Sequence, residues 1–262
     1  MTELPPPFDR VVLGDLVTSD RIIRDGFVAV RDGRIAAIGE GPPPPAVELS
    51  DHRGMLVFPG LVDGHMHTAS AFGWPGIETA TRTAAAGGVT TVVDMPYDIP
   101  KPVTNAELFH EKVGWVNRTA HVDVALYGTI QKSGGTHHIK EIAAAGASSF
   151  KLSTYEYDAT RFPRIDHVEM ERAFARIAET GLMVALHNED QEIVVAMSKA
   201  AQESGRTDPI MHCRTRPPLC GRFAAIDSTA TPFGLTRLTL AKRNAFWSRG
   251  RGTVTDCTSE VA

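Results

Sequence analysis

The sequence predicts an α/β protein with a parallel sheet, preceded by a small β unit. Short β-branched segments, separated by glycine and aspartate turns, fill residues 8 to about 50. From Met55 onward, apolar runs typical of strands alternate five times with segments typical of helices. Five consecutive strand–helix units imply a parallel sheet, which is either a barrel or an open doubly wound sheet.

The composition excludes several classes of protein. The chain has 262 residues, of which 42% are hydrophobic and 22% charged, so global disorder is excluded. A net charge of −4 gives no indication of nucleic acid or of an anionic membrane surface as a partner. The sequence contains no run of 18 apolar residues and no signal peptide, so we expect no membrane span. Its three cysteines make no disulfide framework, and we expect the cytoplasm as compartment.

The first unit lies between two proline clusters, at residues 5–7 and 42–45. Between them, VVLGDLVTSD, GFVAV and GRIAAIG are typical of short strands, and Asp32-Gly33 is a turn signal. A unit this small cannot bury a core of its own. We therefore expect residues 1–54 to form a β segment that packs against another part of the chain.

The alternating part begins at residues 55–63, MLVFPGLVD, a continuous apolar run that predicts a strand buried on both faces. Asp166 with Glu169 makes a capping box for one of the later helices, and Gly181 is the expected residue after its last turn. The predicted strands that follow are 88–95, 121–130, 148–155 and 182–190, and the predicted helices are 77–88, 105–116, 138–147, 168–180 and 191–205. We assign residues 55–218 to this domain. Residues 219–262 have no strand–helix period, and we expect them to form an atypical, disordered tail.

The main candidate metal-binding cluster is His65-Met66-His67, directly after the first strand of the alternation. In an extended segment, residues i and i+2 point to the same side, so both imidazoles can reach one metal ion. Two histidines in a polar loop are the equally weighted alternative. Asp63 either orients a ligand or stabilises the turn.

Two further residues lie at or near strand ends. His187 ends the fifth predicted strand, and Lys151 lies within the fourth, where a lysine is expensive to bury unless it is paired or modified. Functional residues of parallel βα folds gather at the carboxyl ends of strands. We therefore expect His65, His67, Lys151 and His187 to converge. The other histidines fall on predicted helices or at element starts, and His212-Cys213 is only a weak possible metal pair.

Five motifs in this order resemble the cyclic amidohydrolases: PGLVDGHMH, GGVTTVVDMP, SFKLSTYEY, ALHNED and RTRPP. That family includes dihydroorotase, hydantoinase (dihydropyrimidinase) and allantoinase. The resemblance covers about residues 8–218. It implies a (β/α)8 TIM-type barrel with a small β-sandwich assembled from both chain ends. For this chain we expect a partial barrel of about five βα units with an N-terminal β-sandwich segment.

The resemblance also implies a site with two divalent metal ions, zinc first and manganese or cobalt as alternatives. His65 and His67 match the ligands of the more buried ion, and His187 matches a ligand of the second. Lys151 matches a lysine that carbon dioxide carboxylates so that it bridges both ions. The implied reaction is attack of a metal-activated hydroxide on a ring carbonyl of a small cyclic amide or ureide. Tyr155 is the candidate substrate-binding residue.

The sequence departs from the family pattern at its later motifs. No histidine follows His212, so the ligand expected on strand six is missing. Asp227 and Asp256 are the only later aspartates and neither has a strand-end context, so no catalytic proton shuttle is assigned. We expect a copy truncated or frame-shifted after about residue 218, with a divergent short form as the alternative, and impaired activity.

The substrate-side residues argue against dihydroorotase. Thr68-Ala69 follow HMH without the arginine that holds a carboxylate in dihydroorotases, and Tyr97 replaces the asparagine often found after DMP. Both changes favour a hydantoin-like ring that is uncharged or weakly acidic.

Two other function classes compete with the enzyme. One is a catalytically inactive amidohydrolase-fold scaffold or interaction protein. The other is an open-sheet binding protein, which is disfavoured because no glycine-rich phosphate loop follows the first strand. Unpaired edges of a partial barrel predict poor solubility, or a homo-oligomer if the chain folds.

Overall fold

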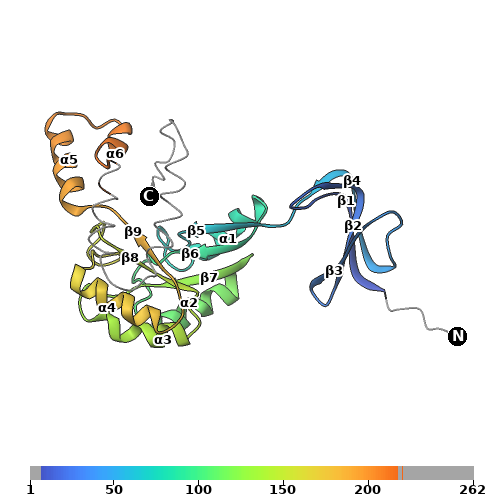
Figure 1. The fold of residues 1–262 in the computed structure, drawn as a ribbon, viewed down its shortest axis with the longest axis horizontal. Helices are drawn as coiled ribbons and strands as arrows, with labels where there is room; N and C mark the ends of the chain where they lie inside the picture. Colours follow the sequence, from blue (N-terminus) through green and yellow to red (C-terminus); the bar gives the residue numbers. More distant parts are fainter. Residues whose placement is uncertain (1–6, 218–219, 221–262) are drawn as a thin grey trace. The chain divides into compact units, whose positions relative to one another are not determined.

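The computed structural model describes residues 7–217 and 220, and the chain divides into two compact units, residues 1–61 and 62–262 (Figure 1). Each unit has its own sheet. Apart from Cys220, the expected atypical tail, with Asp227, Asp256 and Cys257, lies outside the described residues.

The first unit is a four-stranded sheet in the order β3-β2-β1-β4. Its strands are β1 (Phe8–Val17), β2 (Ile22–Arg31), β3 (Arg34–Glu40) and β4 (Ala46–Val57). β1 runs antiparallel to β2 and parallel to β4. Asp32 and Gly33 connect β2 to β3 with φ of 52° and 69°, which is the left-handed geometry that two-residue hairpin turns require. The three strands expected from residues 8–40 are confirmed, and β4 is added.

The predicted strand at residues 55–63 is wrong as a single element. Met55–Val57 complete β4, and residues 58–60 separate it from β5 (Leu61–Met66). β5 is also not buried on both faces, since Leu61 is 58% and Val62 is 67% exposed. The run is interrupted because Pro59 has no N–H to donate to a strand ladder. β5 is exposed because it is an edge strand, with β6 as its neighbour in the sheet.

The second unit contains the five predicted βα units. Its sheet has the order β5-β6-β7-β8-β9, and β6 to β9 pair in parallel. The remaining strands are β6 (Val89–Asp94), β7 (Asp123–Gly128), β8 (Ser149–Ser153) and β9 (Val184–His187). The helices are α1 (Gly76–Ala86), α2 (Ala106–Thr119), α3 (Ile139–Ala144), α4 (His167–Ala178), α5 (Gln191–Glu203) and α6 (Ile210–Arg214), with a 3₁₀ turn η1 at Gly135–His138. No helix among the described residues is both long and apolar enough to cross a bilayer.

The core of the second unit lies between the sheet and α2, α3 and α4, which run along one side of it (Figure 1). Phe109, Ile142, Phe150, Met170 and Ile177 are among its buried members. β8 is buried along its whole length because it is an inner strand. A side chain on β8 is therefore withdrawn from water even where it is polar.

Aspartate and asparagine side chains begin the long helices. Asn105, Asp166 and Asp190 each accept a hydrogen bond from the backbone N–H three residues on, at 2.8–2.9 Å. These caps satisfy donors that the helix itself cannot pair. The aspartate half of the predicted capping box is thus confirmed, and Gly181 follows α4 with φ of 73°.

Candidate metal centre at the carboxyl ends of the strands

Lys151 is buried in β8, with only 4% of its surface exposed. Its Nζ lies 3.1 Å from Nε2 of His65, which is the fifth residue of β5. β6 and β7 lie between these two strands in the sheet order. The two side chains meet only because the sheet curls, which is the geometry of part of a barrel.

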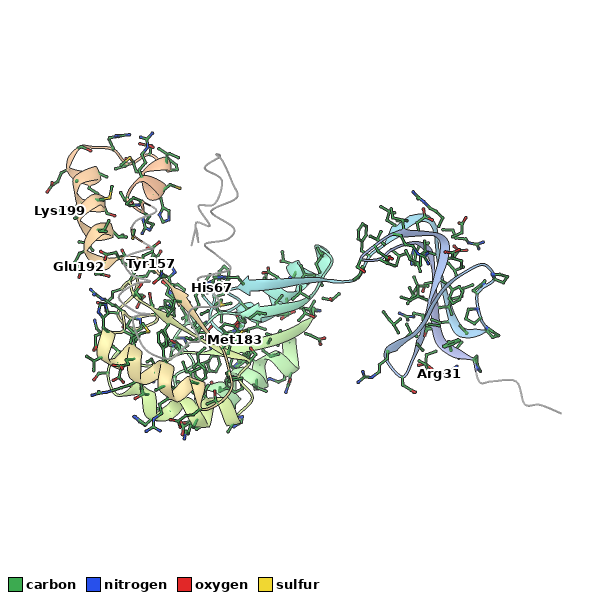
Figure 2. The ribbon with its side chains drawn as sticks, viewed as in Figure 1. Arg31, His67, Tyr157, Met183, Glu192 and Lys199 are labelled. Carbon is green, nitrogen blue, oxygen red and sulfur yellow. The ribbon has the colours of Figure 1, made fainter. Side chains whose placement is uncertain are left out.

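His67 follows β5 by one residue and is half-buried. Its ring centroid lies 5.3 Å from that of His65 and 5.9 Å from that of Tyr97, which follows β6. The two histidines of the HMH motif are thus close neighbours at one end of the sheet. Figure 2 shows His67 and Tyr157 toward this end of the strands, with Met183, which precedes β9, toward the other.

His187 is the last residue of β9, and it lies opposite Ser153 in the register of β8 and β9. Its ring lies 6.3 Å from that of Phe162, and the same Phe162 ring lies 5.7 Å from Nζ of Lys151. The ring of Tyr155, the expected substrate-binding residue, lies 6.5 Å from His187. The structure therefore brings His65 and Lys151 into contact and places His67 beside His65, while His187 and Lys151 both lie near the ring of Phe162.

Glu189 sits next to His187, with Oε2 3.6 Å from the histidine Nε2. Nε of Arg216 lies 3.1 Å from both Glu189 carboxylate oxygens, so Arg216 ties the RTRPP segment to the exit of β9. Burial opposes ionisation, but His187 and Arg216 hold the pKa of Glu189 below its ordinary value.

Arg161 joins the loops at this end of the sheet. Its Nη2 donates to the backbone oxygens of Ser70 at 2.6 Å and Tyr97 at 2.9 Å, and its guanidinium stacks 3.8 Å from the Tyr97 ring centroid. Tyr97 in turn contacts the rings of Tyr157 and Phe162 edge-on, at 5.7 and 6.5 Å. The loops after β5, β6 and β8 thus form one aromatic wall beside His67.

A buried charge cluster lies behind the same loops. Lys112 of α2 places Nζ 2.7 Å from a carboxylate oxygen of Asp94 and 2.7 Å from one of Asp98. All three side chains are excluded from water. The sequence motifs did not indicate this cluster, although Lys112 lies three residues after Phe109 and four before Val116, on the apolar stripe of its helix.

The pKa values of Asp98 and Lys112 in the buried cluster are both raised above their ordinary values. Burial raises the pKa of Asp98 to about 6; the negative charge of Asp94 adds to this effect, and Lys112 opposes it. Burial lowers the pKa of Lys112, but the two carboxylates outweigh it and the net shift is upward.

Other histidines lie away from this site. His137 and His138 stack in η1, where His138 pairs with Glu141, and His110 lies on α2. His212 lies on α6, where burial lowers its pKa.

A shallow depression of about 480 Å³ at the amino ends of β6 and β7 is lined in part by His121 and Asp123. In the described part of the chain, no group of three or more His, Cys, Asp or Glu could hold a metal ion.

The chain is similar to known proteins over most of its length. A family model described as Dihydro-orotase-like matches residues 54–194. An allantoinase of Bacillus velezensis is 36% identical and one of Rubrobacter xylanophilus 33% identical, each over 80% of this chain and 46% of the relative. The solved structure of an L-hydantoinase (dihydropyrimidinase) from Arthrobacter aurescens matches with a TM-score of 0.76 and 30% identity, over 84% of this chain and 49% of that one. The chain spans about half the length of the curated relatives it matches.

The raised pKa of Asp98 predicts that the free energy of unfolding depends on pH. Between its ordinary pKa of 3.8 and its folded value of about 6, the folded protein keeps a proton that the unfolded chain has released. Asp98 therefore lowers the free energy of unfolding as pH rises from about 4 to about 6. Asp98→Asn, which cannot titrate, should lose this decline.

Urea unfolding of both proteins at about pH 4 and about pH 6.5 measures the effect as a difference of differences. The wild type should lose more stability than Asp98→Asn between the two values. An equal pH dependence in both proteins would contradict the assignment.

Proposed function

Because the chain belongs to the dihydro-orotase-like family, we propose that it holds divalent metal ions for the hydrolysis of a cyclic amide bond. The observation that carries this proposal is the contact between the buried Lys151 and His65 across the curled sheet. The allantoinases and the L-hydantoinase named above support the class of reaction.

The donor atoms fit a metal centre only if Lys151 is modified. Imidazoles suit zinc, but the described residues offer no cluster of three His, Cys, Asp or Glu that could hold a metal ion. Carboxylation supplies the missing anion: the amine nitrogen of Lys151 forms a bond to the carbon of carbon dioxide and loses a proton. In this proposal His65 and His67 would hold one ion, His187 would hold the other, and the carboxylated Lys151 would be a ligand to both.

Bound ions would supply Lewis acidity, which lowers the pKa of water and polarises a ring carbonyl. The chain's own residues orient and enclose the substrate. Tyr155, beside His187, is the proposed substrate-binding residue. Tyr97 packs edge-on against His67, and Tyr157 and Phe162 pack edge-on against Tyr97, so these rings would shield one side of His67.

The proposed substrate is an uncharged ring such as hydantoin or allantoin. A ring that carries a carboxylate needs a cation with free donors, and Thr68 and Ala69 provide none after the HMH motif. Arg161 is close, but its Nη2 is engaged by two backbone carbonyls, its face by Tyr97, and its Nε is buried. A small cyclic amide or ureide without a carboxylate therefore fits this end of the sheet better than dihydroorotate.

A scaffold without catalysis is the second candidate, and one observation favours it. Within these 262 residues no histidine follows His212, so they hold no counterpart of the family's strand-six ligand, and no aspartate among them is assigned to the proton transfer. Metal binding and turnover are therefore separate questions.

We expect metal binding to depend on Lys151. Protein loaded with zinc and bicarbonate and then desalted should retain one to about two ions per chain by elemental analysis. Lys151→Ala should retain almost none, because the bridging anion is lost. Lys140→Ala, which removes an exposed lysine paired with Glu179, is the matched control and should bind like the wild type. A wild type without zinc, or Lys151→Ala with a full complement, would contradict the proposal.

We expect these 262 residues alone to hydrolyse hydantoin or allantoin no faster than a metal-free control. General acid–base assistance typically contributes 10²–10⁴-fold, and an amide nitrogen leaves poorly unless it is protonated. The measurement is product formation by the zinc-loaded protein. Turnover that disappears in Lys151→Ala would show this expectation wrong and would exclude the scaffold.

We further propose that the chain self-associates in the cytoplasm. Phe58, Leu61 and Val62 are more than half exposed around the start of the edge strand β5. Exposed strand edges favour pairing with another chain. Sedimentation velocity should show dimers or larger species that grow with concentration, and a concentration-independent monomer would refute self-association.

A further inference from the structure

The backbone on both sides of His67 is held by the segment that leaves β6. The N–H of Met95 donates to the carbonyl of Met66 at 2.8 Å. The N–H of Thr68 donates to Oδ1 of Asp94, also at 2.8 Å. Two consecutive residues of one strand end thus fix the residue before and the residue after His67.

Asp94 is itself held in one orientation. Its Oδ2 accepts from the hydroxyl of Thr68 at 2.8 Å and lies 2.7 Å from Nζ of Lys112. Lys112 also donates to both carboxylate oxygens of Asp98, at 2.7 and 2.8 Å. Since these four side chains are buried, the carboxylate cannot exchange its partners for water.

We propose that Asp94, backed by Lys112 and Asp98, is a positioning residue for His67. It sets the direction of the imidazole before any metal ion arrives. That this positioning serves metal binding rests on the proposed function. The hydrogen bonds from Asp94 are themselves present in the metal-free chain. Groups that orient metal ligands in this way typically change metal affinity by 10- to 100-fold.

Packing alone does not account for this arrangement. An apolar side chain at position 94 would leave the N–H and the hydroxyl of Thr68 without an acceptor. It would also leave Lys112 with one carboxylate in a buried site, and buried charges are costly unless they are paired. The cluster binds Thr68, the residue directly after the HMH motif. At this position it fixes the backbone that carries His67, a proposed metal ligand.

The test uses a variant that keeps the charge balance. Asp94→Asn leaves Lys112 and Asp98 as a neutral pair, but it keeps one acceptor oxygen for the three groups that Asp94 binds, which are the N–H and the hydroxyl of Thr68 and the ammonium of Lys112. The N–H of Thr68 is therefore paired for less of the time. Its amide nitrogen cannot accept from the Thr68 hydroxyl or from Lys112. Asp123→Asn, at the exposed start of β7, is the matched control. Thr68→Val removes only the hydroxyl, and Thr68→Ser restores it.

Two readouts are measured on the full chain. In metal-free protein, hydrogen exchange at the Thr68 amide should be at least tenfold faster in Asp94→Asn, with the amides of β7 and β8 unchanged. In protein with bicarbonate, the zinc dissociation constant should rise about tenfold or more. Thr68→Val should move both readouts in the same direction, and Thr68→Ser and Asp123→Asn should match the wild type.

Unchanged exchange at Thr68 together with unchanged zinc affinity would overturn the inference. Wild-type protein that binds no zinc would refute the proposed function, whereas faster Thr68 exchange in Asp94→Asn would still support the positioning. If Asp94→Asn does not fold, Thr68→Val and Thr68→Ser decide: a difference between them in Thr68 exchange supports the inference, and equality overturns it.

Discussion

A lysine buried in the middle of a sheet needs a partner, because an uncompensated ammonium is costly away from water. Lys151 of β8 meets this constraint by facing His65, three strands away along the sheet. Such a contact requires a curled sheet, and this sheet has five strands in sequence order, with β6 to β9 parallel and helices packed on one side. The candidate metal centre is therefore a consequence of the same geometry that buries the core.

The second unit contains another buried lysine, and the comparison explains the different roles. Lys112 is surrounded by the carboxylates of Asp94 and Asp98, which favour its charged form. Lys151 lies against Nε2 of His65. A metal ion would bind this histidine through the lone pair of a ring nitrogen. One lysine is thus held as a structural cation, and the other is placed where carboxylation would turn it into a ligand.

Much of this architecture could be predicted from the sequence because strands and helices alternate with clear caps. Strand ends also located His65, His67, Lys151 and His187, of which the structure brings His65 and Lys151 into direct contact. The division at residues 58–60 was missed, since an apolar run looks continuous whether it is one strand or two. Lys112 was missed because a lysine on a helix is ordinarily exposed, and only its contact with Asp94 and Asp98 reveals its burial. The ligand roles and the compartment stay predictions.

The most direct test of the account is the position of zinc in crystals of the protein grown with zinc and bicarbonate. Anomalous diffraction at the zinc edge should give a peak about 2.0–2.1 Å from imidazole nitrogens of His65 and His67, with extra density on Nζ of Lys151. Zinc bound elsewhere, with an unmodified Lys151 still facing His65, would contradict it.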